Sequence, residues 1–130
     1  MSKQRILVVD DDTNLARALS LRLVANGFEA MVAADGYTAV ASAQKERPDL
    51  IILDLGLPAG DGFTVLDRLR LNPKLMGMPV IVLSARDPQN NEERALKAGA
   101  TAYFQKPADN EELLCAIRAS LMPNAQTASA

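Results

Sequence analysis

Three consecutive aspartates follow the first apolar run of the chain, where residues 6–14 read ILVVDDDTN. Carboxylates this close repel one another, and each resists ionisation beside its neighbours. Two interpretations are open at this point. Asp10, Asp11 and Asp12 either cap a helix at the surface or form part of a cation site.

Polar side chains also end three later apolar runs: Asp54 ends LIILD, Ser84 ends VIVLS and Lys106 ends AYFQK. Taken singly, a turn acid, a buried hydroxyl and a surface amine are common and need no function. Taken together they matter if the runs are parallel strands, because ligands bind outside the carboxyl ends of such strands. We therefore expect these side chains to converge with Asp10 and Asp11 at one edge of a sheet.

Such an edge would collect about three negative charges against the single ammonium of Lys106. A hard divalent cation would offset the excess, and a few carboxylates with open water positions suit Mg²⁺, with Mn²⁺ as the alternative ion. A carboxylate beside that ion can act as a nucleophile towards phosphorus and form an acyl phosphate. The pattern thus favours phosphoryl chemistry carried by carboxylates, a hydroxyl and an amine.

Composition excludes several other kinds of chemistry. The 130 residues contain no histidine, which rules out Ser-His-Asp and Cys-His arrangements and imidazole zinc sites within the chain. A net charge of −2 does not support binding to a phosphate backbone. Neither a signal peptide nor an apolar stretch of transmembrane length is found.

One cysteine, Cys115, has no partner for an internal disulfide, so a reducing compartment such as the cytoplasm is expected. Cys115 lies among Leu113, Leu114 and Ile117, and we expect it to pack in the core.

Apolar runs and helix-like segments alternate along the chain. Strands are predicted at residues 5–10, 29–34, 50–54, 80–84 and 102–106. Helices are predicted at residues 13–26, 36–46, about 63–70, 90–98 and 109–122.

In the first helix Leu15, Ala18, Leu19 and Leu23 fall on one face, and Asp12 is placed to cap it. This order predicts a doubly wound α/β domain with a five-stranded parallel sheet and helices on both faces, over residues 1–122. Residues 123–130, PNAQTASA, are expected to be a disordered tail or the start of a linker.

Four motifs carry a resemblance to a known family: VVDDD at residues 8–12, LIILDLGLPAGDG at 50–62, VIVLSA at 80–85 and GATAYFQKP at 99–107. In this order and spacing, the chain resembles the receiver domain of two-component response regulators from about residue 5 to residue 121. The resemblance implies a flavodoxin-like (βα)5 fold with strand order 2-1-3-4-5, as in the chemotaxis member of the family.

The resemblance also assigns roles at the sheet edge. Asp54 is implied to be the phosphoacceptor and, with Asp10, Asp11 and the backbone carbonyl of Gly56, to hold the metal. Of these, Asp11 is the direct ligand and Asp10 acts through water. Lys106 is implied to bind the phosphoryl group.

Further implied roles concern the switch. Ser84 is the switch hydroxyl and Tyr103 the aromatic side chain that follows it by turning inward, although Tyr103 alone is typical of half-buried packing. Pro107 resembles a proline that follows a cis peptide bond, so a cis Lys106–Pro107 bond is predicted.

The implied function is a phosphorylation-dependent signalling switch that catalyses only its own phosphoryl transfer and dephosphorylation. The donor is a sensor histidine kinase or a histidine phosphotransfer protein. The face built from the fourth helix, the fifth strand and the fifth helix then changes to regulate an unknown output protein or domain. Neither nucleic acid nor membrane is an expected partner of this segment, and whether the chain is a stand-alone receiver or part of a longer protein is left open.

Some positions depart from the common family pattern. Gly56, two residues after Asp54, has no side chain to shield or assist water, which leaves the dephosphorylation rate open. Thr101 and Ala102 stand where a pair of aspartates marks one large DNA-binding class, so the dimer surface of that class is not supported.

Three rival functions are possible. A receiver-like scaffold that is not phosphorylated ranks second, although such scaffolds usually lack an acid, the hydroxyl or the lysine. A haloacid-dehalogenase-type phosphatase would need an acid where Gly56 stands. A nucleotide-binding domain would need a glycine-rich turn after the first strand, and DDDTN has none.

Overall fold

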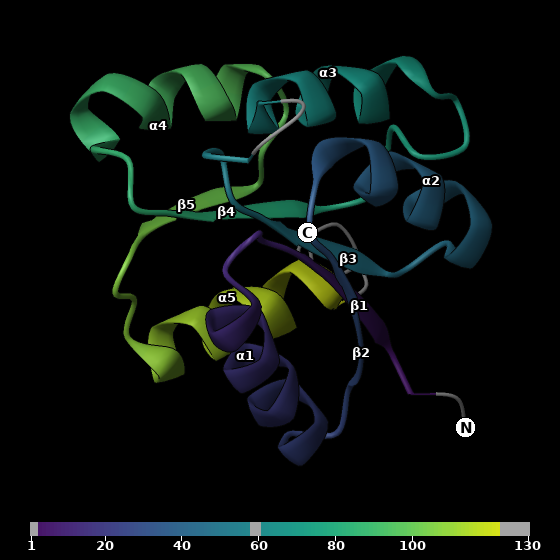
Figure 1. Ribbon diagram of the computed structural model, residues 1–130, viewed down its shortest axis with the longest axis vertical. Helices are drawn as coiled ribbons and strands as arrows, with labels where there is room; N and C mark the ends of the chain where they lie inside the picture. Colours follow the sequence, from purple (N-terminus) through teal and green to yellow (C-terminus); the bar gives the residue numbers. More distant parts are fainter. Residues whose placement is uncertain (1–2, 58–60, 123–130) are drawn as a thin grey trace, which may run out of the picture.

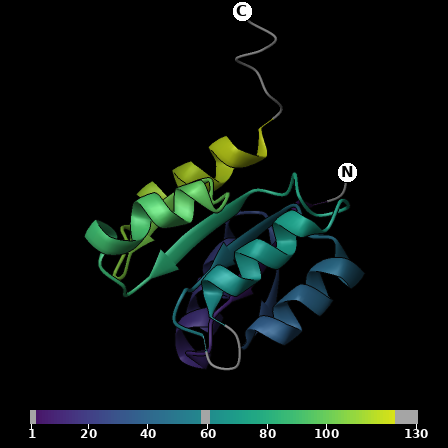
Figure 2. The ribbon, with the colours of Figure 1, turned by 90° about the horizontal axis from the view of Figure 1, so that it is seen from above.

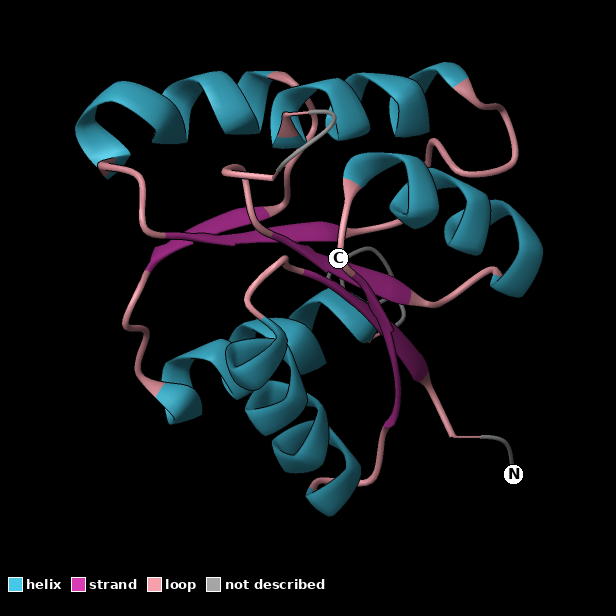
Figure 3. Ribbon diagram, viewed as in Figure 1, coloured by secondary structure: helices cyan, strands magenta, loops and turns pink. Residues whose placement is uncertain are grey.

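The computed structural model describes residues 3–57 and 61–122 (Figure 1). The strands are β1 (Arg5–Val9), β2 (Glu29–Ala33), β3 (Leu50–Leu53), β4 (Val80–Ser84) and β5 (Ala102–Gln105). The helices are α1 (Thr13–Ala25), α2 (Gly36–Glu46), α3 (Gly62–Leu71), α4 (Pro88–Lys97) and α5 (Asn110–Leu121). Strands and helices alternate along the chain, as the hydrophobic pattern predicts (Figure 3).

The five strands form one parallel sheet in the order β2-β1-β3-β4-β5. This confirms the doubly wound, flavodoxin-like fold. The strand order reverses between β1 and β3, where Val9 lies beside Leu53 in register. The residues that follow these two strands therefore come out side by side at the switch point of the sheet.

Helices cover both faces of the sheet (Figures 1 and 2). One face carries α1 and α5, and its core includes Ile6, Val8 and Leu23. The other face carries α2, α3 and α4 over a core that includes Leu7, Val9 and Leu66. Alternate residues of β1 thus enter opposite cores, which explains why the central strands read as unbroken apolar runs.

The three central strands, β1, β3 and β4, are buried almost throughout, whereas the two edge strands are not. Val32 of β2 is 48% exposed, and all four residues of β5 keep some solvent contact. Only the central strands have neighbours on both sides and helices on both faces. Among the described helices, none is long and apolar enough to cross a membrane.

Every helix begins after an aspartate whose carboxylate accepts a hydrogen bond from a backbone N–H of the first turn. These capping residues are Asp12, Asp35, Asp61, Asp87 and Asp109. For Asp12 the capping interpretation is therefore confirmed, with its Oδ1 3.1 Å from the Leu15 nitrogen.

Three expectations from the sequence are corrected. Cys115 is exposed, because the buried stripe of α5 consists of Leu113, Leu114 and Ile117, and Cys115 points away from it. The fourth helix begins at Pro88 and not at residue 90, since Asp87 caps it and the fixed φ of proline suits a first turn. Ala18 is exposed and only Ala16, Leu19 and Leu23 of α1 are buried. The tail predicted at residues 123–130 lies outside the described residues.

At the amino-terminal edge of the sheet, one arginine ties two loops together. The Arg70 guanidinium, on α3, donates hydrogen bonds to the carbonyl oxygens of Met76 (2.6 Å), Met78 (3.2 Å) and Gly99. Burial lowers the pKa of Arg70, and the three carbonyls compensate for part of the lost hydration. Gly99 has a φ of +109°, and a Cβ there would collide with the Arg70 side chain. This edge is braced, in contrast to the edge that carries the acids.

Replacing Arg70 by methionine should therefore lower the free energy of unfolding by about 2 kcal/mol, because three carbonyls lose a charged donor. Urea denaturation of the two proteins measures this difference. Arg68→Met, an exposed change on the same helix, is the matched control and should stay within about 0.5 kcal/mol of the wild type. Equal losses in the free energy of unfolding for the two substitutions would show that the hydrogen bonds of Arg70 contribute no more to stability than an exposed arginine does.

Candidate functional site

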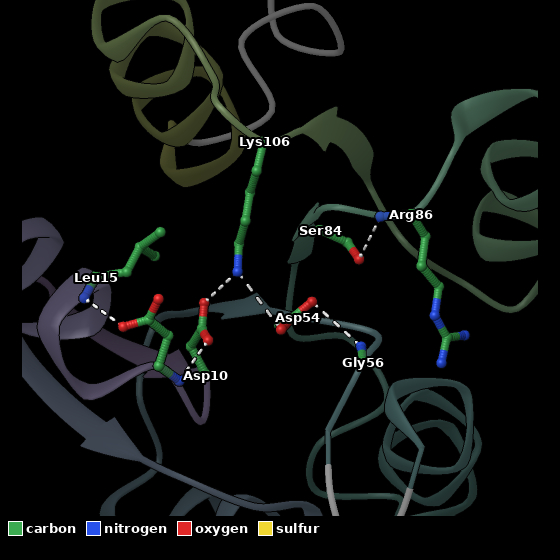
Figure 4. A network of polar contacts seen from close by, with 8 residues as sticks. Asp10, Leu15, Asp54, Gly56, Ser84, Arg86 and Lys106 are labelled. Atoms are coloured by element: carbon green, nitrogen blue, oxygen red, sulfur yellow. Dashed lines mark hydrogen bonds and ion pairs between the residues drawn. The ribbon is translucent and has the colours of Figure 1, made fainter.

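The polar residues predicted to converge do so at the carboxyl ends of four strands (Figure 4). Asp10 follows β1, Asp54 follows β3, Ser84 ends β4 and Lys106 follows β5. Backbone hydrogen bonds extend the ladder one step beyond the strands. The N–H of Asp10 donates to Ala33 O (3.0 Å), that of Asp54 to Val9 O (2.9 Å) and that of Lys106 to Ser84 O (2.8 Å). The sheet itself thus positions these side chains.

Asp10, Asp11 and Asp54 form a carboxylate cluster, with one oxygen from each lying within 4.8 Å of the others. Asp10 and Asp54 are 3% and 7% exposed, whereas Asp11 is open to solvent. An all-oxygen donor set with one open side suits a hard divalent cation that keeps several waters. These three residues could therefore hold Mg²⁺ or Mn²⁺.

Lys106 extends into the cluster from the far side of the sheet edge (Figure 4). Its Nζ donates to Asp10 Oδ2 at 2.7 Å and lies 3.5 Å from Asp54 Oδ2. Burial opposes the ammonium charge, but the hydrogen bond to Asp10 and the charges of Asp54 and Asp10 outweigh it and raise the pKa of Lys106. One ammonium thus compensates only part of the charge of three carboxylates.

The pKa of Asp10 is raised, chiefly because burial disfavours its charged form. Hydrogen bonds from Lys106 and from the Asp12 N–H act in the opposite direction without cancelling this effect, and the charge of Asp54 adds to it. For an acid, a raised pKa in the folded state means that stability is lost as the pH rises through that pKa. At neutral pH the ionised Asp10 therefore has a net destabilising effect on the metal-free protein.

Two glycines bring the backbone close to Asp54. The N–H of Gly56 donates to Asp54 Oδ1 at 3.2 Å. A Cβ on Gly62 would lie 2.7 Å from the Asp54 carbonyl oxygen, so only glycine fits where α3 begins. The carbonyl of Gly56 as a metal ligand stays a prediction.

Ser84 and Tyr103 are connected through the β4–α4 loop, residues 85–87. Ser84 is 1% exposed, and its Oγ accepts a hydrogen bond from the Arg86 N–H at 3.2 Å. The Tyr103 hydroxyl donates to the Arg86 carbonyl oxygen at 2.7 Å. Tyr103 is half-buried, as expected, and burial raises the pKa of its hydroxyl. The two predicted switch residues therefore share one neighbour.

That neighbour, Arg86, was missed by the sequence analysis. Its guanidinium also pairs with Asp61 Oδ2 at 3.3 Å. In the sequence, Arg86 is only a basic residue two positions after a strand end. Without the fold, this position does not distinguish it from other surface arginines. The predicted cis Lys106–Pro107 peptide bond is confirmed.

The fold and the site together define a doubly wound α/β domain with a carboxylate cluster at its switch point. Residues 6–118 match the family described as response regulator receiver domain. The chain belongs to this family.

Relatives and solved structures agree with this assignment. The chain is 40% identical over 117 residues to the DNA-binding dual master transcriptional regulator RpaA of Synechocystis, a match that covers 90% of this chain and 48% of RpaA. A putative response regulator from Chloroflexus aurantiacus superposes with a TM-score of 0.88 at 33% identity, covering 92% of this chain and 98% of that one. The chain spans about half the length of the curated relatives it matches.

A further solved structure bears on the acidic pocket. The receiver domain of the sensor histidine kinase PA1611 from Pseudomonas aeruginosa is 31% identical, with a TM-score of 0.85 over 92% of this chain and 98% of that one. It was solved with a magnesium ion coordinated in its active site cleft.

Neutralising Asp10 should stabilise the metal-free protein. We expect Asp10→Asn to raise the free energy of unfolding at pH 7 by about 1 kcal/mol, the scale of one partly screened charge contact. If Mg²⁺ binds at this cluster, it should stabilise the wild type, and the same change should abolish that stabilisation. Thermal unfolding with and without Mg²⁺ measures both effects.

Asp12→Asn is the matched control, because asparagine caps a helix about as well as aspartate and Asp12 is exposed. It should leave the metal response intact. A loss of stability in metal-free Asp10→Asn would contradict the conclusion that the charge of Asp10 destabilises the metal-free protein.

Proposed function

We propose that this domain is a phosphorylation-dependent switch in two-component signalling, with Asp54 as the phosphoacceptor. The observation that carries the proposal is the position of the Asp54 carboxylate, which is clustered with Asp10 and Asp11 and lies 3.5 Å from Lys106 Nζ. A nucleophile, a cation site and a phosphoryl-binding ammonium are thereby offered to one incoming group. Receiver domains are signalling domains, and the activity proposed here is limited to the chemistry of Asp54 itself.

The donor would be a phosphohistidine on a sensor histidine kinase or a histidine phosphotransfer protein, because this chain has no histidine. One carboxylate oxygen of Asp54 attacks phosphorus and an O–P bond forms. The N–P bond of the donor breaks, and its electron pair stays on the imidazole, which takes a proton from solvent. The product is an aspartyl phosphate, and the reaction depends mainly on positioning and charge neutralisation.

Mg²⁺, with Mn²⁺ as a substitute, fits the donor set of Asp10, Asp11 and Asp54, and the Gly56 carbonyl is proposed as a further ligand. When bound, the ion would neutralise charge on the phosphoryl oxygens. The protein's own residues do the rest: Asp54 supplies the nucleophile, and Lys106, released from part of its pairing with Asp10, binds a phosphoryl oxygen.

Ser84 would report the modification to the surface. Its Oγ accepts a hydrogen bond from the Arg86 N–H, and its O–H would donate to a phosphoryl oxygen on Asp54 and draw the side chain towards that group. Tyr103, tied to the same loop, would follow by turning further inward and change the face formed by α4, β5 and α5. The change is a population shift, limited by how differently the two states hold the phosphoryl group.

The switch would act on a downstream protein or an attached domain. This segment itself would contact neither nucleic acid nor membrane, and it would work in the cytoplasm. An unphosphorylated interaction scaffold is the alternative. The buried, charge-strained Asp10 counts against it, because a scaffold that only binds partners gains nothing from retaining this cluster.

Incubation with acetyl phosphate and Mg²⁺ should add one phosphoryl group, about 80 Da, to the wild type. Intact-mass spectrometry measures the gain, which should disappear in Asp54→Asn and without Mg²⁺. Asp12→Asn is the matched control and should still be modified. A wild type that binds no Mg²⁺ and gains no mass from acetyl phosphate or a donor kinase would move the function to the scaffold.

Ser84→Ala should separate modification from switching. The variant should still gain the phosphoryl group at Asp54, but amide chemical shifts of α4 and β5 should respond much less than in the wild type. Ser84→Thr keeps the hydroxyl and should restore the response. A full response in Ser84→Ala would remove Ser84 from the switch.

A further inference from the structure

Arg86 joins three parts of the site that are otherwise separate. Its N–H donates to the Ser84 hydroxyl (3.2 Å), and its carbonyl accepts from the Tyr103 hydroxyl (2.7 Å). Its guanidinium reaches Asp61, the capping residue of α3 (3.3 Å). The backbone of Arg86 is thus fixed at the site, while its charged end is held outside it.

The restraint on that charged end is weak. The Arg86 and Asp61 side chains are 35% and 45% exposed, and the pair has a single contact at 3.3 Å. Exposed ion pairs of this kind contribute little to stability, because water competes for both partners. A stronger anion within reach would therefore draw the guanidinium away from Asp61.

Gly56 places no side chain of its own beside Asp54. A Cβ built on Gly56 would lie 4.0 Å from Asp54 Oδ1, which is an ordinary van der Waals distance. Lys106 comes from the opposite side and is already paired with Asp10 (Figure 4). If Asp54 is phosphorylated, Lys106 is shared between Asp10 and the dianionic phosphoryl group. Part of the negative charge then remains for another cation to neutralise.

We propose that Arg86 is a phosphoryl-binding residue, which leaves Asp61 and binds the phosphoryl oxygens once Asp54 is modified. This inference rests on the proposed function of Asp54. Guanidinium is suited to the exchange, because its planar fork donates two parallel hydrogen bonds to phosphoryl oxygens and one at best in the present contact with Asp61.

The exchange also gives the β4–α4 loop a second input. Movement of the Ser84 hydroxyl would displace the Arg86 N–H that is bonded to it. Movement of the guanidinium towards the phosphoryl group would displace the same residue through its side chain. Because the Arg86 carbonyl holds Tyr103, both movements reach the surface through one hydrogen bond. Asp61 then competes with the phosphoryl group for the Arg86 guanidinium. Its attraction for Arg86 is what the phosphoryl group must exceed.

Two substitutions with opposite expected signs test this inference. The readout is the dissociation constant of beryllofluoride, a phosphoryl analogue, measured by NMR titration at fixed Mg²⁺. Arg86→Gln should weaken binding about tenfold, because a charge-assisted hydrogen bond is lost. Asp61→Asn should strengthen binding about two- to fivefold, because the competitor of the exposed pair is removed while the cap of α3 is kept.

A double-mutant cycle completes the design. In the Arg86→Gln background, Asp61→Asn should have no further effect, because there is no guanidinium left to release. Thermal unfolding without beryllofluoride should show both variants folded, and Arg86→Lys should recover part of the affinity.

A merely structural bridge would behave differently, with both single variants weakening binding in the same direction. That result, or an Arg86→Gln affinity within twofold of the wild type, would overturn the inference and leave the function of Asp54 standing. A wild type that binds neither Mg²⁺ nor beryllofluoride and gains no mass from acetyl phosphate or a donor kinase would overturn the proposed function and the inference together.

Discussion

The repulsion among Asp10, Asp11 and Asp54 is the constraint on which the rest of the structure depends. Two of these carboxylates are almost fully buried, and one ammonium, on Lys106, is shared between them. A fold could hold such a cluster only on a rigid support, because a flexible loop would let the charges separate. Strands buried on both faces provide that support, and their backbone ladder continues through the acidic residues themselves.

The two edges of the sheet differ because of this constraint. At the amino-terminal edge, the guanidinium of Arg70 is satisfied by backbone carbonyls, and the loops are braced. At the carboxyl-terminal edge, charges are left partly uncompensated, and the loop that carries Arg86 is held by a few hydrogen bonds and one exposed ion pair. The site thus retains groups that a charged ligand can rearrange.

Much of this could be predicted from residue order alone. The apolar runs, the helix caps and the glycines after helices define ten elements whose order predicts the sheet, and the motifs around Asp54 and Lys106 identify the family. The errors fall where local pattern is ambiguous. Cys115 stands among apolar neighbours in the sequence yet faces solvent, because a turn of 100° per residue carries it off the buried stripe.

The sequence by itself determined which residues end the strands, and hence which side chains meet at one edge, because parallel strands bring their carboxyl ends together. Only the tertiary structure decided how those side chains share their charges. Lys106 pairs more closely with Asp10 than with Asp54, and Arg86 pairs with Asp61 outside the cluster. These choices depend on distances across elements far apart in the chain, which spacing along one strand or helix does not encode.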